Sequence, residues 1–493
     1  MKRHFFDSSF YLFLIGVCIH QLAVSKYGLA IFPDSVNYIH AGKSFLTQFE
    51  FHQFTGEYYV SWPPLYPIQL SLLSLFDDYF FALSSLYHAV IFGLTLVSLL
   101  KIIQFEIPKS QLTKINSCLL FLFLMGAWPI MQLSLEFVSE TGFIFLALLG
   151  FHFGIQKKRI YLGLFFFSLL MLQRYIGFIW WASFSLIMLN STSNKRKWAL
   201  LVFISSFPFL AWIFRNYQLT DTLSGKRGES FISLSENLLL GLDVISKWLL
   251  PHFLPFGIRI SVILILITIF ILFKINTQKL IFFKKISFLN RSRTSDSTIT
   301  TSILFLGIYF LSLWLISTAG KSEALSFRML APMYPFLLII LLRSYFLNSE
   351  ISVNTIRTIY FVFLLTISIW QGVFSIRYIN SKMEFGAGGF NTTEWRESDF
   401  YNWYRETGNQ IPITASNAPD AFYALFLKKI KSTPFQNEEI KLNEFKGLTG
   451  NSVIVWINLM HRKTLIQEDS LVKYLNLKVN LKRSSFTVYQ TSD

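Results

Sequence analysis

Three carboxylic acids lie close to the ends of apolar runs, where a charged side chain is energetically costly and is often functional. Asp34 lies in FPDSVNYIHAGKSF, about five residues after the first apolar run. Glu136 and Glu140 lie in LSLEFVSETGF, and their i, i+4 spacing puts both on one side of a helix. A carboxylate in such a place accepts a proton from a hydroxyl or amine, or binds a hard divalent cation. The plainer interpretation is that Asp34 caps a helix starting at Ser35 and that both glutamates cap the next helix.

Basic residues on the same predicted side of the membrane could bind an anion. They stand in outer loops or at the ends of apolar runs, against the usual preference of Lys and Arg for cytoplasmic loops. The set comprises Arg174, Arg215, Lys226, Arg227, Lys321 and Arg328. Because a guanidinium binds phosphate through two parallel hydrogen bonds, the set predicts a substrate that carries phosphate. Each residue alone could instead extend to reach lipid head groups.

Trp62 and Tyr66 are held by three prolines in WPPLYP. Rigid presentation of this kind suits either stacking on a sugar ring or holding the loop against the carboxylates. Trp and Tyr also anchor membrane interfaces in many proteins. The sequence leaves these interpretations open.

Membrane-spanning helices must hold these residues, because the composition fits no soluble class. Of 493 residues, 53% are hydrophobic and 15% are charged, Phe contributes 54, and the mean hydropathy is +0.47. The formal net charge is +16, and the basic residues lie largely in short loops between apolar runs. The preference of Lys and Arg for cytoplasmic loops explains this charge, so no nucleic acid partner is expected. Eight histidines without metal-binding spacing and two cysteines in apolar runs predict no histidine or thiolate metal site.

Eleven apolar runs are long enough, or nearly long enough, to cross a bilayer. They lie near residues 9–29, 80–104, 114–133, 137–156, 160–173, 175–190, 198–216, 257–275, 300–319, 329–347 and 357–377. Lys2 and Arg3 place the N-terminus in the cytoplasm, which leaves Asp34 outside. The stretch 160–190 could be one long span, but we expect two short helices with Arg174 at their outer tip.

The expected architecture is an α-helical, multi-pass protein of the cytoplasmic (inner) membrane. Residues 1–378 form the transmembrane domain, with a first outer loop at 30–79 and a second outer loop from Arg215 to about Phe256. After residue 378 the chain becomes polar and rich in Gly, and IPITASNAPDAFYAL is typical of a strand, a turn and a helix. Residues 379–493 therefore predict a small extracytoplasmic α/β domain.

The order of these motifs resembles the GT-C superfamily of integral membrane glycosyltransferases, in particular the bacterial branch related to protein O-mannosyltransferases and lipid A aminoarabinose transferases. The resemblance covers most of residues 1–377. It is carried by DSVNYIHAGKSFL, WPPLYPI, VSETGFIF, RYIGF, WIFRNYQLTDTLSGKRGES and FRMLAPMYPFLLI. NAPDAFYAL is similar to part of the short C-terminal domains of this branch.

The resemblance implies transfer of a sugar from a polyprenyl-phosphate donor to an acceptor outside the cytoplasm. Asp34 matches the essential acidic residue of such enzymes, and Glu140 matches a second acidic position where many relatives carry Asp. Arg174, Arg215, Lys226, Arg227 and Arg328 become candidates for binding the donor phosphate, and Tyr38, Trp62, Tyr66 and Glu136 for positioning substrate. No cofactor is certain, although Asp34 and Glu140 could together hold Mg²⁺ or Mn²⁺.

Three other function classes stay open on the sequence alone. A transporter or flippase of lipid-linked sugars would place charges near mid-span and often contains an internal repeat. An O-antigen-type polymerase or ligase would carry its main outer loop late in the chain. A non-catalytic scaffold would not need carboxylates and arginines on one face. The sugar, the acceptor, the stereochemical outcome and the oligomeric state are not predicted.

Overall fold

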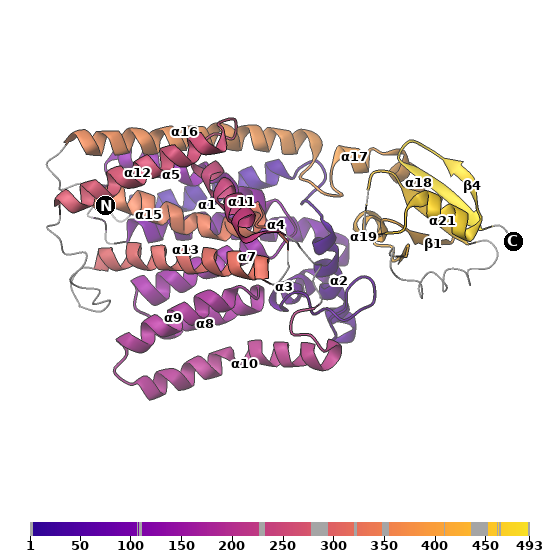
Figure 1. Cartoon of the computed structure of the whole chain (residues 1–493), viewed down its shortest axis with the longest axis horizontal. Helices are drawn as coiled ribbons and strands as arrows, with labels where there is room; N and C mark the ends of the chain where they lie inside the picture. Colours follow the sequence, from indigo (N-terminus) through magenta and orange to yellow (C-terminus); the bar gives the residue numbers. More distant parts are fainter. Residues whose placement is uncertain are drawn as a thin grey trace.

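The apolar runs of the sequence form helices that lie side by side in the computed structural model of the chain (Figure 1). The structure describes residues 3–105, 107, 111–225, 232–277, 294–319, 323–347, 354–408, 410–434, 452–460, 462 and 465–491. In Figure 1 the helices run across the view, with the N-terminus toward the left and the C-terminal sheet at the far right.

Eleven apolar helical stretches in the described residues correspond one to one with the expected runs. Six are long and apolar enough to cross a membrane, namely Asp77–Gln104, Lys114–Ser134, Lys195–Thr220, Ser297–Ala319, Phe327–Phe346 and Arg357–Phe385. Five are shorter, namely Ser9–Ala23, Glu140–Gln156, Ile160–Gln173, Gly177–Leu189 and Phe256–Ile265. The chain is an α-helical integral membrane protein, and the expected fold class is confirmed.

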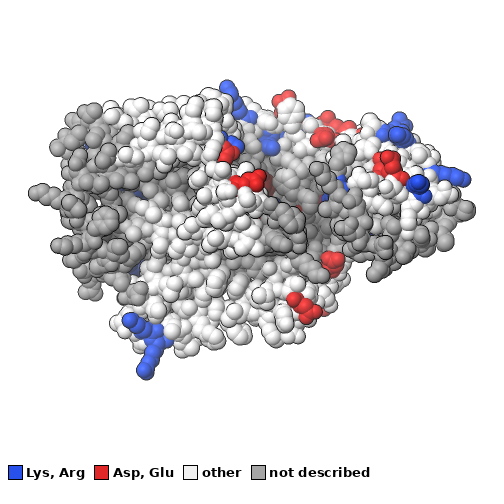
Figure 2. Space-filling model, in the orientation of Figure 1, with Lys and Arg blue, Asp and Glu red and all other residues white. Residues whose placement is uncertain are grey.

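The helices of the bundle are, in chain order, α1 (Arg3–Ala23), α4 (Phe80–Gln104), α5 (Lys114–Met125), α6 (Trp128–Ser134), α7 (Glu140–Gly150), α8 (Ile160–Gln173), α9 (Gly177–Ser191), α10 (Lys195–Thr220), α12 (Phe256–Thr277), α13 (Thr294–Ala319), α14 (Phe327–Leu330), α15 (Tyr334–Leu347) and α16 (Asn354–Phe385). In Figure 2 much of the described bundle surface is uncharged, charged side chains of both signs lie near its upper middle, and a separate group of Lys and Arg lies where α9 turns into α10. That turn lies at the end of the bundle away from the C-terminal sheet.

The ambiguous stretch 160–190 forms two helices, as expected. The chain is extended at Arg174, between α8 and α9, with φ −151° and ψ 140°. The turn closes when the backbone N–H of Gly177 donates to the carbonyl of Arg174 at 2.9 Å. A Cβ at Gly177 would lie 2.4 Å from the carbonyl oxygen of Leu170, so this tight turn needs glycine.

The two long loops that we expect outside the cytoplasm, called the first and second outer loops above, contain helices of their own. The first holds α2 (Pro33–Gln48) and α3 (Leu65–Ser74). In the second, α10 continues to Thr220 and a further helix, α11 (Leu234–Leu249), follows. We did not predict α11, although LSENLLLGLDVISKWL has the spacing of apolar residues typical of an amphipathic helix. The hydroxyl of Ser233 caps it by accepting from the backbone N–H of Glu236 at 3.2 Å.

The C-terminal part is a small α/β unit. Its helices are α17 (Thr393–Arg396), α18 (Asp399–Thr407), α19 (Pro419–Phe426) and α21 (Glu468–Leu475). Its strands are β1 (Ile413–Ser416), β2 (Lys431–Ser432), β3 (Val453–Ile457), β4 (Leu477–Lys482) and β5 (Phe486–Thr491). They form one sheet in the order β2-β1-β3-β5-β4, parallel at β2-β1-β3 and antiparallel elsewhere. The expected strand, turn and helix at IPITASNAPDAFYAL correspond to β1 and α19.

A short extended segment joins the outer loop, the bundle and the C-terminal unit. The backbone N–H of Ala30 donates to Leu135 at 2.8 Å, and the carbonyl of Ala30 accepts from Phe137 at 2.9 Å. On its other side the carbonyl of Ile31 accepts from Phe390 at 2.9 Å. These bonds fix the backbone just before α2, and so they fix the start of the helix that carries Asp34.

Candidate functional site

Asp34 lies in the first turn of α2, which begins at Pro33. The expected helix start at Ser35 is wrong, and Asp34 is not the residue before the helix. Phe32 holds that position, and its backbone N–H donates to the hydroxyl of Ser35 at 3.0 Å. The Asp34 carboxylate instead accepts from Arg328, with Nη2 and Oδ2 2.5 Å apart. The simple capping interpretation therefore does not account for this carboxylate.

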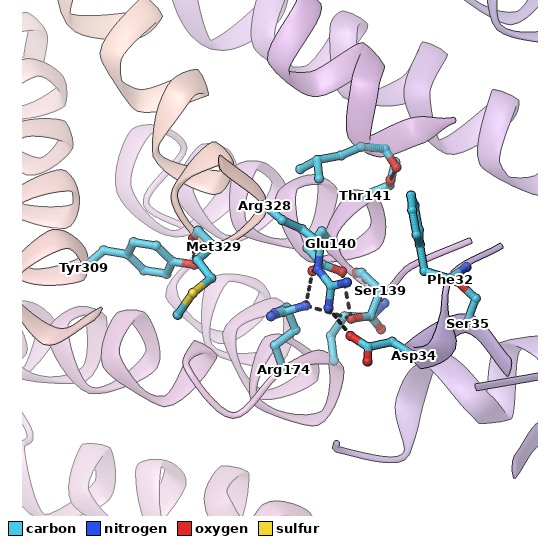
Figure 3. Close-up of polar contacts among 12 residues, drawn as sticks. Phe32, Asp34, Ser35, Ser139, Glu140, Thr141, Arg174, Tyr309, Arg328 and Met329 are labelled. Atoms are coloured by element: carbon cyan, nitrogen blue, oxygen red, sulfur yellow. Dashed lines mark hydrogen bonds and ion pairs between the residues drawn. The ribbon is translucent and has the colours of Figure 1, made fainter. Parts of the chain in front are cut away.

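Arg328 joins Asp34 to a second carboxylate. Its Nε lies 2.6 Å from Oε1 of Glu140, the first residue of α7. Glu140 is completely buried, whereas the side chains of Arg328 and Asp34 keep 28% and 34% of their exposure. Figure 3 shows the Arg328 guanidinium lying between the two carboxylates. The accessible part of this cluster is thus the pair that Arg328 forms with Asp34.

Arg174 completes the cluster from the other side of Glu140. Its Nη1 lies 2.5 Å from Oε1 of Glu140 and donates to the hydroxyl of Ser139 at 3.2 Å. The neighbouring Gln173 donates through Nε2 to the carbonyl of Ser139 at 3.1 Å. Two arginines thus hold one buried carboxylate, which also lies favourably at the N-terminus of α7. Glu140 does lie in the first turn of α7, as the capping interpretation requires, but that interpretation does not include its ion pairs with Arg174 and Arg328.

The four charged groups come from four separate elements: α2, α7, the α8–α9 turn and α14. Two carboxylates face two guanidiniums, so the cluster is electrically balanced. Ser139 and Gln173 were not predicted. The only sequence signal for them is that each directly precedes a predicted site residue, Glu140 and Arg174 respectively.

Glu136 does not lie on one helical side with Glu140, as its spacing predicts. It precedes α7, in the segment that forms a parallel bridge with Ala30. The backbone there is not helical, and it is held by the bonds of Leu135 and Phe137 to Ala30. Burial, together with the charge of Glu140, raises the pKa of Glu136 from the ordinary 4.5 to about 7.

Aromatic rings from the first outer loop pack beside Asp34. The ring centroid of Tyr38 lies 5.2 Å from that of Trp62 and 5.1 Å from that of Tyr66. Tyr66 is buried, and its hydroxyl is 2.8 Å from Nε2 of His88. It therefore packs inside the protein and is not an exposed membrane anchor. Tyr59, which we did not predict, lies against Tyr38 and Trp62.

Arg215, another predicted phosphate-binding residue, does not join this cluster. Arg215 donates to the carbonyl of Tyr59 at 3.2 Å and to Oδ1 of Asn216 at 3.1 Å, and its guanidinium lies 4.5 Å from the centroid of Trp212. These contacts tie α10 to the first outer loop. Lys226 and Arg227 lie outside the described residues, as does Lys321.

A divalent cation does not fit the carboxylates as they are arranged. Asp34 and Glu140 are both bonded to guanidinium groups, and they share Arg328. Within the described ranges no three side chains of His, Cys, Asp or Glu lie together in a way that could hold a metal ion.

The fold matches solved membrane enzymes. Neither a protein-family profile nor a curated protein sequence matches the chain. The crystal structure of ArnT from Cupriavidus metallidurans in the apo state matches with a TM-score of 0.62 and 10% identity, over 98% of each chain. ArnT bound to undecaprenyl phosphate gives a TM-score of 0.57 and 11% identity, over 97% of each chain. This chain has the fold of ArnT.

ArnT is a lipid A aminoarabinose transferase of the GT-C type, so the resemblance noted in the sequence is confirmed at the level of the fold. The oligosaccharyltransferase of Archaeoglobus fulgidus, crystallised with Zn and sulfate, matches with a TM-score of 0.44 and 10% identity. That match covers 90% of this chain and 68% of the other.

Proposed function

We propose that the protein is a glycosyltransferase that moves a sugar from a polyprenyl-phosphate donor to an extracytoplasmic acceptor. The observation that carries the proposal is the Asp34–Arg328–Glu140 arrangement. In it a carboxylate and a guanidinium lie side by side at the most accessible part of an otherwise buried cluster, and such groups can accept a proton and bind a phosphate. Both groups are needed for transfer from a lipid phosphate.

Asp34 acts as the base. The acceptor oxygen or nitrogen forms a bond to the anomeric carbon of the sugar, and its proton passes to the Asp34 carboxylate. The bond between that carbon and the phosphate oxygen breaks, and the electron pair stays with the polyprenyl phosphate. Since phosphate is already a good leaving group, no second carboxylate has to protonate it.

Arg328 stabilises the charge that develops on the leaving phosphate. Its guanidinium is partly exposed and already lies within 2.5 Å of a carboxylate oxygen. A phosphate oxygen can occupy a similar position, because both anions accept from the same fork of N–H groups. Donor binding therefore exchanges one anionic partner of Arg328 for another and releases Asp34 to accept the proton.

Glu140 and Arg174 hold Arg328 in place. Glu140 bonds Arg328 on one side and Arg174 on the other, so Arg328 keeps an anionic partner when it leaves Asp34. In this proposal Arg174 orients Glu140 and adds positive charge near the phosphate. Arg215, Lys226 and Arg227 stay candidates for contacts with the lipid phosphate farther from Asp34.

In the aromatic group at Tyr38, Trp62 and Tyr66, Trp62 keeps part of its surface exposed and is the ring against which the sugar is positioned, whereas Tyr38 and Tyr66 are buried and support it. Tyr38 packs against both of the other rings, so its ring holds them beside α2. Glu136 supports the same region through its bridge with Ala30. Mg²⁺ or Mn²⁺ has no part in the steps above.

The fold supports a lipid donor, since ArnT has been crystallised with undecaprenyl phosphate. We place the protein in the inner membrane, with its N-terminus cytoplasmic and with Asp34 and the C-terminal domain of residues 379–493 outside. The basic turn between α9 and α10 lies at the end of the bundle away from the C-terminal sheet, which agrees with this orientation.

The test is a transfer assay with purified full-length protein, a panel of radiolabelled polyprenyl-phosphate sugars and a membrane extract as acceptor. We expect label from one donor to become covalently attached to an acceptor and undecaprenyl phosphate to be released. Movement of an intact labelled donor across a vesicle membrane, without any new covalent product, would instead identify a flippase.

A further inference from the structure

A buried polar side chain on α11 holds the backbone that leads into Arg328. Asn237 on this helix is completely buried. Its Oδ1 accepts from the backbone N–H of Leu325 at 2.8 Å. Its Nδ2 donates to the hydroxyl of Ser317 at 2.6 Å and to that of Thr318 at 2.9 Å, both at the end of α13. One side chain therefore links α11 to the two described ends of the connection between α13 and α14.

The packing around Leu325 supports the same function for α11. Gly241 lies one helical turn after Asn237, on the same side of α11. A Cβ at Gly241 would lie 2.8 Å from Cδ1 of Leu325 and 3.1 Å from Phe310. The missing side chain thus makes room for Leu325, so that the helix can come close to the segment that Asn237 bonds.

Arg328 follows Leu325 by three residues, and the backbone on the C-terminal side of Arg328 is also held by a hydrogen bond. The hydroxyl of Tyr309 on α13 donates to the carbonyl of Met329 at 3.2 Å, and Figure 3 shows this contact beside the Arg328 cluster. The backbone that carries Arg328 is therefore bonded on both sides, by Asn237 and by Tyr309. A guanidinium that must meet two carboxylates and then a phosphate depends on this placement, because shifts of about 1 Å weaken such contacts strongly.

We propose that Asn237 is a positioning residue for Arg328, so that α11 sets the affinity of the site for a lipid phosphate. The inference rests on the proposed function, since it assumes that Arg328 binds the donor phosphate. It assigns a purpose to the helix of the second outer loop: α11 holds the phosphate-binding arginine and touches neither the phosphate nor the sugar.

The test measures binding of undecaprenyl phosphate to the purified full-length protein in detergent. Asn237→Leu keeps most of the side-chain volume but removes all three hydrogen bonds. We expect it to raise the Kd for undecaprenyl phosphate about fivefold to tenfold, the range typical of substitutions that act through a neighbouring group. In an Arg328→Ala background the same substitution should change the Kd by less than about twofold, because the group that it positions is gone.

Asn116→Leu is the matched control. Asn116 is also buried, donates to the carbonyl of Gln111 at 2.6 Å and accepts from the hydroxyl of Tyr345 at 3.2 Å. Tyr345 lies at the end of the Phe327–Phe346 span that is farthest from Arg328. This variant should lower thermal stability to a similar degree and leave the Kd within about twofold of wild type.

Different results would overturn different claims. If Arg328→Ala binds undecaprenyl phosphate as wild type does, the phosphate-binding function of Arg328 is wrong. If Arg328→Ala weakens binding while Asn237→Leu does not, or if the two effects add in full, only the positioning function of Asn237 is wrong. Should Asn237→Leu fail to fold, Gly241→Ala tests the same point by pushing on Leu325, and an unchanged Kd there contradicts the inference.

Discussion

Arg328 Nη2 lies 2.5 Å from Asp34 Oδ2, although the two residues are 294 positions apart in the sequence. The contact joins the first outer loop to the start of a helix late in the chain. Without donor, the proposed base and the proposed phosphate-binding residue therefore neutralise each other.

Replacement of Asp34 by Asn should strengthen binding of undecaprenyl phosphate, because the phosphate no longer competes with a carboxylate for Arg328. Since the pair is partly exposed, we expect the Kd to fall by only about twofold to fivefold. Titration of wild type and Asp34→Asn with the lipid, in the same detergent, measures this change. Weaker binding by the variant would show that Asp34 supports phosphate binding, contrary to the exchange that we propose.

Removal of Arg174 should lower the stability of the fold. Glu140 is completely buried and would keep only Arg328 as a cationic partner. We expect Arg174→Ala to reduce the free energy of unfolding by about 2 kcal/mol or more, since breaking a buried ion pair leaves a charge uncompensated. Thermal unfolding followed by gel filtration checks this. The double variant Arg174→Met/Glu140→Gln should recover most of the loss, and failure to recover would mean that Glu140 is not the group involved.

The stability of the protein should fall as the pH rises through 7, because of Glu136. Burial raises its pKa from 4.5 in the unfolded chain to about 7 in the fold, so the folded protein binds a proton that the unfolded chain releases. The stabilisation is complete below pH 4.5 and is lost above about 7. The difference corresponds to about 3 kcal/mol. Glu136→Gln should therefore be more stable than wild type at pH 8 and similar to it near pH 5, as measured by melting temperature. Parallel pH profiles for the two proteins would falsify this assignment.

Gly389 should tolerate no side chain. Its φ is +56°, and a Cβ there would lie 2.0 Å from the carbonyl oxygen of Ile31. Gly389→Ala must shift the segment that precedes Asp34, so we expect a loss of roughly 2 kcal/mol or more in stability and a loss of transfer activity. Gly307→Ala is the control, because an added Cβ meets nothing within 4 Å in the middle of α13. A Gly389→Ala protein as stable and active as Gly307→Ala contradicts the function of this segment.

The helical framework could be predicted because a membrane span needs a long apolar run, and such runs are visible residue by residue. All eleven runs became helices or parts of helices, including the two short ones on either side of Arg174. Helix α11 was missed because the prediction relied on such continuous apolar runs. It is amphipathic and lies within an outer loop, so it produces no continuous apolar run.

From the sequence we expected three carboxylates and six basic residues on one face, and the structure brings four of these together: Asp34, Glu140, Arg174 and Arg328. Their pairing could not be predicted, because it depends on how four elements pack. Glu136 shows the limit of local rules: its i, i+4 spacing suggested a shared helix with Glu140, but pairing with Ala30 keeps Glu136 out of the helix. Asn237 gives no signal at all, because a buried asparagine looks like any other until its partners are known.

The most direct test of the central claim compares transfer from a polyprenyl-phosphate sugar by wild type, Asp34→Asn and Asp77→Asn. Asp77 lies in the same outer loop, and its carboxylate is exposed and pairs only with Lys43, at 2.7 Å, among the described contacts. We predict that wild type and Asp77→Asn transfer the sugar at similar rates, and that Asp34→Asn folds, binds undecaprenyl phosphate and transfers at least about a hundredfold more slowly, as expected for loss of a general base. Equal transfer by Asp34→Asn and Asp77→Asn would contradict the assignment of Asp34 as the base.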